Sequence, residues 1–89
     1  MVERTLTITN RAGIHARPAA AIVKTAGRFK SELQFTKDTM TVDGKSIMGI
    51  ITLGAPYGTK LDMRCEGPDE HELADAIEHL FEHRFEEEP

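Results

Sequence analysis

The sequence has few of the features that mark secreted or membrane proteins. Its 89 residues include one cysteine and no tryptophan. The single cysteine, Cys65, cannot form a disulfide within the chain and favours a reducing compartment. No apolar run approaches the roughly 20 residues of a membrane-spanning helix, so no membrane insertion is expected. The first residues enter a strand pattern directly, without the apolar region of a secretory signal. We therefore expect a cytoplasmic protein.

Positive charge and aromatic residues are also scarce. Lysine and arginine number 11 against 15 acidic residues, which leaves a net charge of −4. This balance disfavours a nucleic-acid binder that neutralises phosphates. The outward positions of the predicted strands carry polar residues and no aromatic ones, which weakens the alternative of a ferredoxin-like RNA-binding module. No nucleic-acid partner is expected. The basic residues gather in the first third of the chain, at Arg11, Arg17, Lys24, Arg28 and Lys30.

The periodicity of apolar residues predicts a small α+β fold. Alternating segments predict strands over residues 2–9, 32–37, 40–42 and 59–66. Helical spacing predicts helices over residues 16–26 and 47–53, and a last helix that begins after Asp69. Asp69 with Glu72 suggests a capping box at its start. The order β-α-β-β-α-β-α and the polar face of each strand indicate an antiparallel or mixed sheet with helices on one side. Residues 1–89 are predicted to form one domain, with 86–89 a frayed tail. Arg4 falls on the inward face of the first strand, where the pattern offers no reason for it.

The residues around His15 have the composition of a phosphate site. Pro18 suits the first turn of a helix, which places His15 at or near the N-cap. The backbone N–H groups of Ala16 and Arg17 and the positive end of the helix dipole then form an anion site. The Arg17 guanidinium adds a fork that suits phosphate. A neutral imidazole in such a place can accept a phosphoryl group, so His15 is the predicted phosphorylated residue.

The short helix after Ser46 carries more apolar surface than one buried stripe needs. If Ile50 and Leu53 face the core, Met48 and parts of Ile47 and Ile51 remain outside. Such a patch marks a partner surface, although an adjacent loop that covers it is the alternative. Ser46 itself is a good N-cap residue.

Metal and cofactor sites are not expected. His79 and His83 are four residues apart on the last predicted helix and could hold a metal ion between them. No third ligand is evident, and glutamates surround both, so a solvated helix face is the better interpretation.

Two motifs resemble a known family. Asn10-Arg11-Ala12-Gly13-Ile14-His15-Ala16-Arg17-Pro18-Ala19 resembles the phosphohistidine signature of HPr, the phosphocarrier of the bacterial phosphoenolpyruvate-dependent phosphotransferase system. Gly44-Lys45-Ser46-Ile47-Met48-Gly49-Ile50 resembles the second signature of that family, around its regulatory serine. The resemblance covers nearly the whole chain. It implies an open-faced β-sandwich, in which a four-stranded antiparallel sheet has three helices on one face.

The same resemblance implies the function. His15 accepts a phosphoryl group on Nδ1 from enzyme I, ultimately from phosphoenolpyruvate, and donates it to an EIIA-type acceptor protein, with Arg17 as phosphate ligand. The chain is then a carrier in a relay and not an enzyme. The matching docking face consists of Ala20, Lys24, Ile47, Met48 and Ile51.

Regulation and branch remain open at this level. The resemblance implies phosphorylation of Ser46 by an HPr kinase/phosphorylase in many bacteria, and we expect a monomer. The alternative function is a nitrogen-branch or mainly regulatory HPr-like carrier without a role in sugar transport. Residues 80–87 resemble nitrogen-branch members, which keeps that alternative open.

Overall fold

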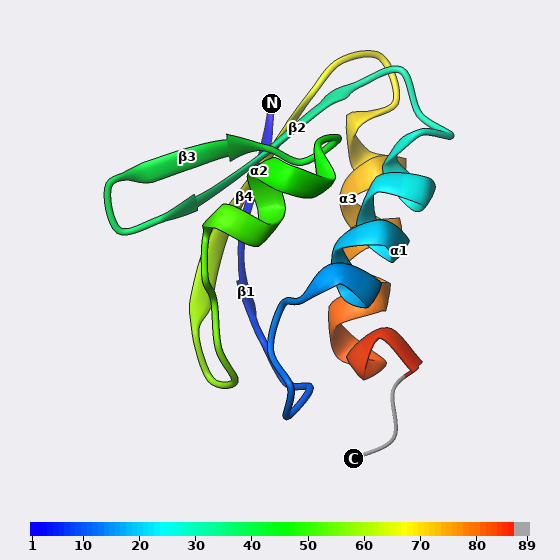
Figure 1. The fold of residues 1–89 in the computed structure, drawn as a ribbon. Helices are drawn as coiled ribbons and strands as arrows, with labels where there is room; N and C mark the ends of the chain where they lie inside the picture. Colours follow the sequence, from blue (N-terminus) through cyan, green and yellow to red (C-terminus); the bar gives the residue numbers. More distant parts are fainter. Residues whose placement is uncertain (87–89) are drawn as a thin grey trace.

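The chain folds into one antiparallel sheet and a set of helices. The computed structural model describes residues 1–86. In chain order, these residues form β1 (Val2–Thr7), α1 (Ala16–Ala26), β2 (Glu32–Lys37), β3 (Met40–Asp43), α2 (Ile47–Thr52), β4 (Lys60–Glu66), α3 (Glu70–Glu82) and the 3-10 turn η1 (Arg84–Glu86) (Figure 1). The predicted order of strands and helices is confirmed, and η1 follows it as an addition.

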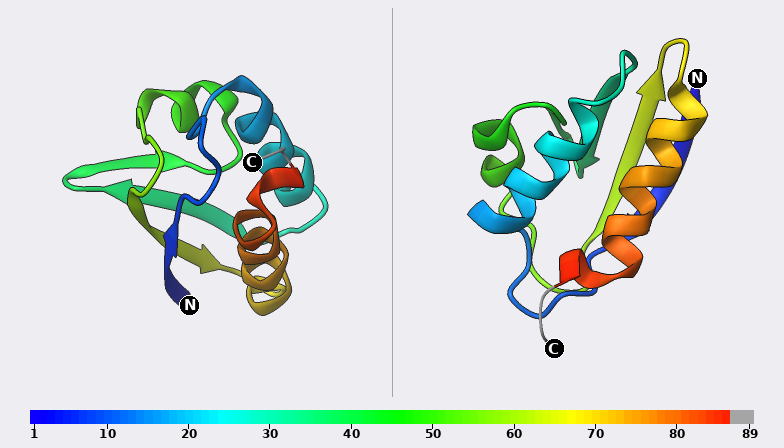
Figure 2. Two further views of the ribbon diagram at one scale, coloured as in Figure 1. Left: turned by 90° about the horizontal axis from the view of Figure 1, so that it is seen from below. Right: turned by 90° about the vertical axis from the view of Figure 1, so that its right-hand side faces the viewer.

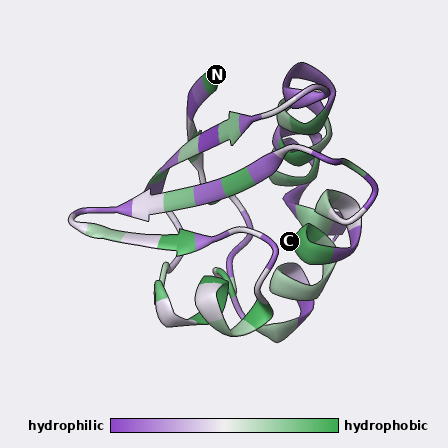
Figure 3. Cartoon of the chain, turned by 90° about the horizontal axis from the view of Figure 1, so that it is seen from above, coloured by the Kyte–Doolittle hydropathy of each residue, from purple (hydrophilic) through white to green (hydrophobic). Residues whose placement is uncertain are grey.

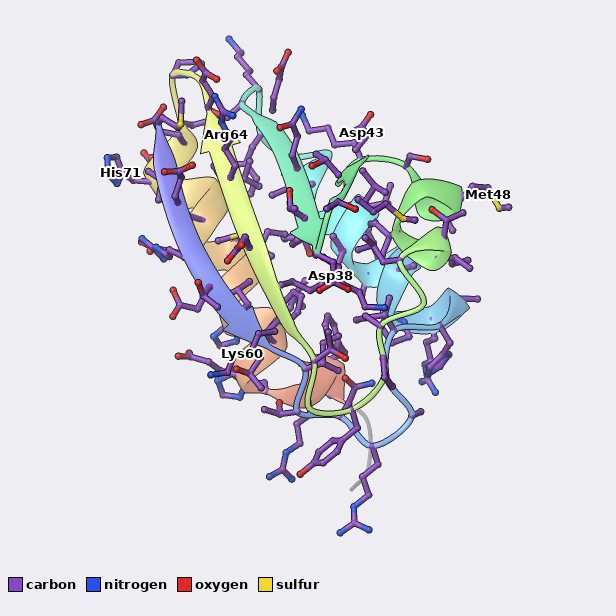
Figure 4. All side chains as sticks on the ribbon, turned by 90° about the vertical axis from the view of Figure 1, so that its left-hand side faces the viewer. Asp38, Asp43, Met48, Lys60, Arg64 and His71 are labelled. Atoms are coloured by element: carbon purple, nitrogen blue, oxygen red, sulfur yellow. The ribbon has the colours of Figure 1, made fainter. Side chains whose placement is uncertain are left out.

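The sheet has the strand order β1-β4-β2-β3, and every neighbouring pair is antiparallel. Figure 4 is seen from the strand side, with β1, β4 and β2 in front and α1 and α3 behind them. Hydrophobic and hydrophilic residues alternate along the strands (Figure 3). The register pairs buried residues with buried residues, as with Leu6 opposite Leu61 and Phe35 opposite Met63. The predicted open-faced β-sandwich is confirmed.

The core lies between the sheet and the two long helices. Phe35 on β2 is fully buried, and its ring centroid lies 6.1 Å from that of Phe81 on α3. Burial of apolar side chains contributes about 25 cal/mol for each Å² removed from water, so this layer is the main source of stability. The helices contribute Ala19, Ile22, Ala26, Leu73, Ala74, Ile77 and Phe81 to it.

Arg4 on the edge strand β1 is explained by the helix behind it. Its Nη1 lies 2.9 Å from Asp75 Oδ1 and 2.6 Å from Glu78 Oε1, both on α3. Because β1 is an edge strand, the side chain runs across the rim of the core and reaches these carboxylates while its head stays partly in water. The residue without a reason in the sequence therefore ties the first strand to the last helix.

The predicted capping box at Asp69 is wrong. Asp69 is the N-cap residue of α3, but its side chain makes no capping hydrogen bond. Its carboxylate instead accepts the backbone N–H groups of Lys30 and Ser31, at 3.0 and 2.9 Å, and the Ser31 hydroxyl. The segment before β2 and the start of α3 are adjacent only in the folded chain, so the local pattern could not reveal this contact.

The chain turns back onto the core after α3. Phe85 has φ 56°, is buried, and packs edge-on against Phe81 with centroids 4.9 Å apart. Glu86, which the sequence assigns to a frayed tail, belongs to this turn, and the other residues of that predicted tail lie outside the described ones. Within residues 1–86, no helix is long and apolar enough to cross a membrane.

Candidate functional site

His15 is the N-cap residue of α1. Its backbone is extended, with φ −128° and ψ −165°, and its carbonyl accepts the N–H of Ala19 at 3.0 Å. Pro18 has no N–H, so Ala16 and Arg17 supply the N–H groups that have no acceptor within the helix. The His15 side chain makes no capping hydrogen bond to them. The predicted position of His15 at a helix N-terminus with two backbone donors is confirmed.

The loop before His15 is held against the turn that follows α2. Gly13 has φ +74°, and a Cβ on it would lie 2.8 Å from the Ala55 carbonyl oxygen and 2.9 Å from Pro56 Cα. The N–H of Ile14 donates to the same Ala55 oxygen at 2.9 Å, and Ile14 is buried. Asn10 Nδ2 donates to the Gly13 carbonyl at 2.7 Å. This close packing fixes the direction in which the chain enters α1 and therefore the place of His15.

The three residues that would meet a phosphate are open to a partner. His15, Ala16 and Arg17 are exposed, while Pro18 and Ala19 are buried directly behind them. Among residues 1–86, Arg17 takes part in none of the ion pairs found within 4.0 Å. An exposed imidazole beside an arginine and two backbone donors can exchange a group with another protein without opening the fold.

Ser46 is the N-cap residue of α2. Its Oγ accepts the N–H of Gly49 at 3.0 Å, and the side chain is half-buried. The structural role that the sequence suggests for this serine is therefore confirmed.

Two lysines brace α2 in a way that sequence reasoning missed. Lys45 Nζ donates to the Phe29 carbonyl at 2.9 Å, just before the helix begins. Lys37 Nζ, from β2, donates to the Leu53 carbonyl at 3.0 Å, just after the helix ends. A helix of six residues is too short to be stable alone, so these tethers contribute to its placement. Each joins residues 16 positions apart, and no local pattern points to such a pair.

The predicted docking residues lie on two neighbouring helices. The start of α1 and α2 run along the same side of the molecule (Figures 2 and 4). Ala20 and Lys24 on α1 are exposed, as are Ile47 and Met48 on α2, and Ile51 is half-buried. Met48 points away from the body of the protein (Figure 4).

The other side of α2 faces the core. Ile50 and Leu53 are buried, as the helical spacing predicts. The alternative that a loop covers the outer apolar surface is wrong, because Ile47 and Met48 remain exposed.

The remaining candidate residues lie elsewhere. His79 and His83 on α3 stack with ring centroids 4.0 Å apart and are exposed. Over residues 1–86, no group of three or more potential ligands is placed to hold a metal ion. Cys65 is buried in β4, and burial raises the pKa of its thiol to about 11, so it stays protonated near neutral pH.

The fold and this site define a class: a small open-faced α+β protein that presents a histidine and an arginine at an exposed helix N-terminus. The sequence model of the family described as "PTS HPr component phosphorylation site" matches residues 2–83. The chain therefore belongs to the HPr family of phosphocarrier proteins.

Individual relatives agree with this assignment. The phosphocarrier protein HPr of Treponema pallidum is 50% identical over 88 residues, which cover 99% of this chain and 100% of the relative. A crystal structure of HPr from Thermoanaerobacter tengcongensis is 45% identical, covers 100% of both chains and superposes with a TM-score of 0.95. Crh of Bacillus subtilis, a catabolite-repression protein described as a swapped dimer, is 33% identical with a TM-score of 0.76, over 94% of this chain and 97% of its own.

Proposed function

We propose that this chain carries a phosphoryl group on Nδ1 of His15. It accepts the group from phosphorylated enzyme I, which is charged by phosphoenolpyruvate, and donates it to an EIIA-type acceptor protein. The observation that carries this proposal is the exposed His15 at the N-cap of α1, beside Arg17 and two backbone donors without a helical acceptor.

The surroundings of His15 suit both ends of the transfer. The neutral imidazole has a lone pair for attack on phosphorus, and the donor leaves as the new N–P bond forms. The product carries negative charge, which the amides of Ala16 and Arg17, the helix dipole and the Arg17 guanidinium stabilise. His15 is regenerated only when the group passes to an acceptor, so the protein is a reactant in a relay and not an enzyme.

The docking face in this proposal is the exposed surface of α1 and α2. Its apolar part lies on α2 and its basic part on α1, so it fits partners that offer an apolar patch with acidic residues around it. We call the five residues below the docking face from here on. They are Ala20, Lys24, Ile47, Met48 and Ile51.

Ser46 is the proposed point of control. A phosphate on its Oγ would add negative charge at the start of α2, beside the docking face, and would repel acidic partners. The enzyme in this proposal is an HPr kinase/phosphorylase. Without sugar transport, a nitrogen-branch or mainly regulatory carrier uses the same His15 chemistry with other acceptors.

Phosphorylation with purified components tests the carrier function. The protein is incubated with phosphoenolpyruvate and enzyme I, and phosphorus NMR is used to look for an acid-labile phosphate on nitrogen. We expect label on the wild type and on His71→Ala, an exposed histidine outside the site, and none on His15→Ala. An unlabelled wild type, or full label on His15→Ala, would refute the proposal. Transfer from the labelled protein to sugar-branch and nitrogen-branch EIIA proteins then separates the two alternatives.

Two further experiments address regulation and assembly. Incubation with ATP and host extract should give an acid-stable phosphate that is absent from Ser46→Ala. Light scattering after size exclusion should give the mass of one chain, 9.9 kDa. Twice that mass would contradict the proposed monomer and favour a dimer such as the one described for Crh.

A further inference from the structure

We infer that Met48 is a reversible oxidation site, and that conversion of its thioether to the sulfoxide weakens docking of the phosphotransfer partners. The inference rests on the proposed function, because it concerns the docking face through which His15 is reached. It adds a second, redox-dependent form of control to a surface that already has Ser46 beside it.

Met48 is the most exposed sulfur of the described residues. Its relative exposure is 70%, compared with 57% for Met1 and 48% for Met40. Met63, at 1%, is enclosed in the core beneath the sheet. Oxidation of methionine depends on access of the oxidant to sulfur, so Met48 is an early target and Met63 a protected one.

The single thiol does not compete for the oxidant. Cys65 is fully buried in β4. Burial also raises the pKa of its thiol to about 11, so the reactive thiolate is scarce near neutral pH. Oxidation of the folded chain is therefore directed to its exposed thioethers.

The chemistry requires only a peroxide. The Met48 sulfur attacks the terminal oxygen of hydrogen peroxide, the O–O bond breaks as the S–O bond forms, and water leaves. Sulfur loses two electrons and peroxide gains them. A methionine sulfoxide reductase reverses the change, which makes it a switch and not damage alone.

The fold should tolerate the sulfoxide. Most of the Met48 side chain lies in solvent, and the contacts that place α2 belong to other groups: the Ser46 cap and the two lysine tethers. Ile50 and Leu53, on the opposite side of the helix, supply its buried contacts. A change of polarity at Met48 therefore acts on docking and leaves the packing of the chain intact.

Docking should respond strongly to that change. A partner that covers Ile47, Met48 and Ile51 removes the thioether from water at little cost, because the thioether is apolar. The sulfoxide oxygen is a strong acceptor, and its burial without a donor is unfavourable. We expect docking to weaken by about tenfold, the lower part of the range for a buried polar group without a partner.

The other exposed methionines lie outside the docking face. Met40 begins β3 at the turn of the β2–β3 hairpin, and Met1 precedes β1, where its ammonium group donates to Glu70 at 2.7 Å. Met40→Leu is therefore the matched control, since it removes an exposed thioether and leaves the docking face unchanged.

The test compares phosphoryl transfer before and after oxidation. Wild type, Met48→Leu and Met40→Leu are treated with hydrogen peroxide, freed of it, and mapped by peptide mass spectrometry, with circular dichroism to confirm the fold. Transfer from phosphorylated enzyme I is then timed at low carrier concentration. We expect transfer to the wild type and to Met40→Leu to slow by about tenfold, and to recover with methionine sulfoxide reductase. The treated-to-untreated ratio of Met48→Leu should stay near one.

Two outcomes would overturn the inference. The first is an unchanged rate in wild type whose Met48 peptide is oxidised. The second is equal slowing of Met48→Leu. Failure of the untreated wild type to accept phosphate at all is a different result, because it refutes the proposed function itself.

Discussion

Replacement of Gly13 by alanine tests how the site is held in place. Gly13 has φ +74°, where an L-residue with a side chain is strained by about 1–2 kcal/mol. Its new Cβ would also meet the Ala55 carbonyl oxygen at 2.8 Å and Pro56 Cα at 2.9 Å. Both atoms belong to backbone that cannot rotate away, so relief requires a shift of one loop, at about 1–3 kcal/mol more.

Gly58 offers the control for this substitution. It has φ +87°, but a Cβ there would meet nothing within 4 Å. Gly58→Ala should therefore lose only the strain of about 1–2 kcal/mol, and Gly13→Ala the sum of both effects, about 2–5 kcal/mol. Urea unfolding followed by circular dichroism measures both, because the chain has no tryptophan for fluorescence.

The same pair links packing to function. A shifted Gly13 loop moves the N-cap of α1, so Gly13→Ala should also slow phosphorylation of His15 under conditions where the variant is fully folded. Gly58→Ala should change that rate less. Equal losses of stability in the two variants, or a neutral Gly13→Ala, would show that the close approach to Ala55 and Pro56 does not hold the site.

Two further substitutions test the contacts at helix starts. The hydrogen bonds from Ser31 and from the Lys30 backbone lower the pKa of Asp69 from 3.8 to about 2. Because the folded-state pKa is the lower one, Asp69 adds stability above pH 4 that is lost as the pH falls toward 2, so Asp69→Asn should be less stable at neutral pH and flatter between pH 4 and 2 in urea midpoints. An unchanged slope over that interval would contradict this role. Ser46→Ala loses the bond from the Gly49 N–H and should cost about 1 kcal/mol in the same assay, and a loss near zero would show that water replaces the cap.

Much of the fold could be predicted from local patterns. The alternation in β4 places Leu61, Met63 and Cys65 inward, and all three are buried. The helical spacing after Ser46 predicts which side of α2 is covered, and the structure agrees. These predictions succeed because one face of each element must leave water, and the period of the element decides which residues share that face.

The candidate site was accessible for a related reason. Pro18 marks a helix start, a helix start provides unbonded N–H groups, and a histidine with an arginine at such a place suggests phosphate chemistry. All of these residues lie within four positions of one another. The partners, by contrast, came from the resemblance to the HPr family and not from the residues themselves.

The sequence by itself determined the elements, their buried faces and the chemistry at the start of α1, because each depends on neighbours along the chain. Tertiary structure alone decided what holds these elements together. Arg4 reaches α3, Asp69 receives the segment before β2, and Phe85 folds back onto Phe81. Such contacts join groups that are distant in sequence, so they exist only once packing has brought those groups together.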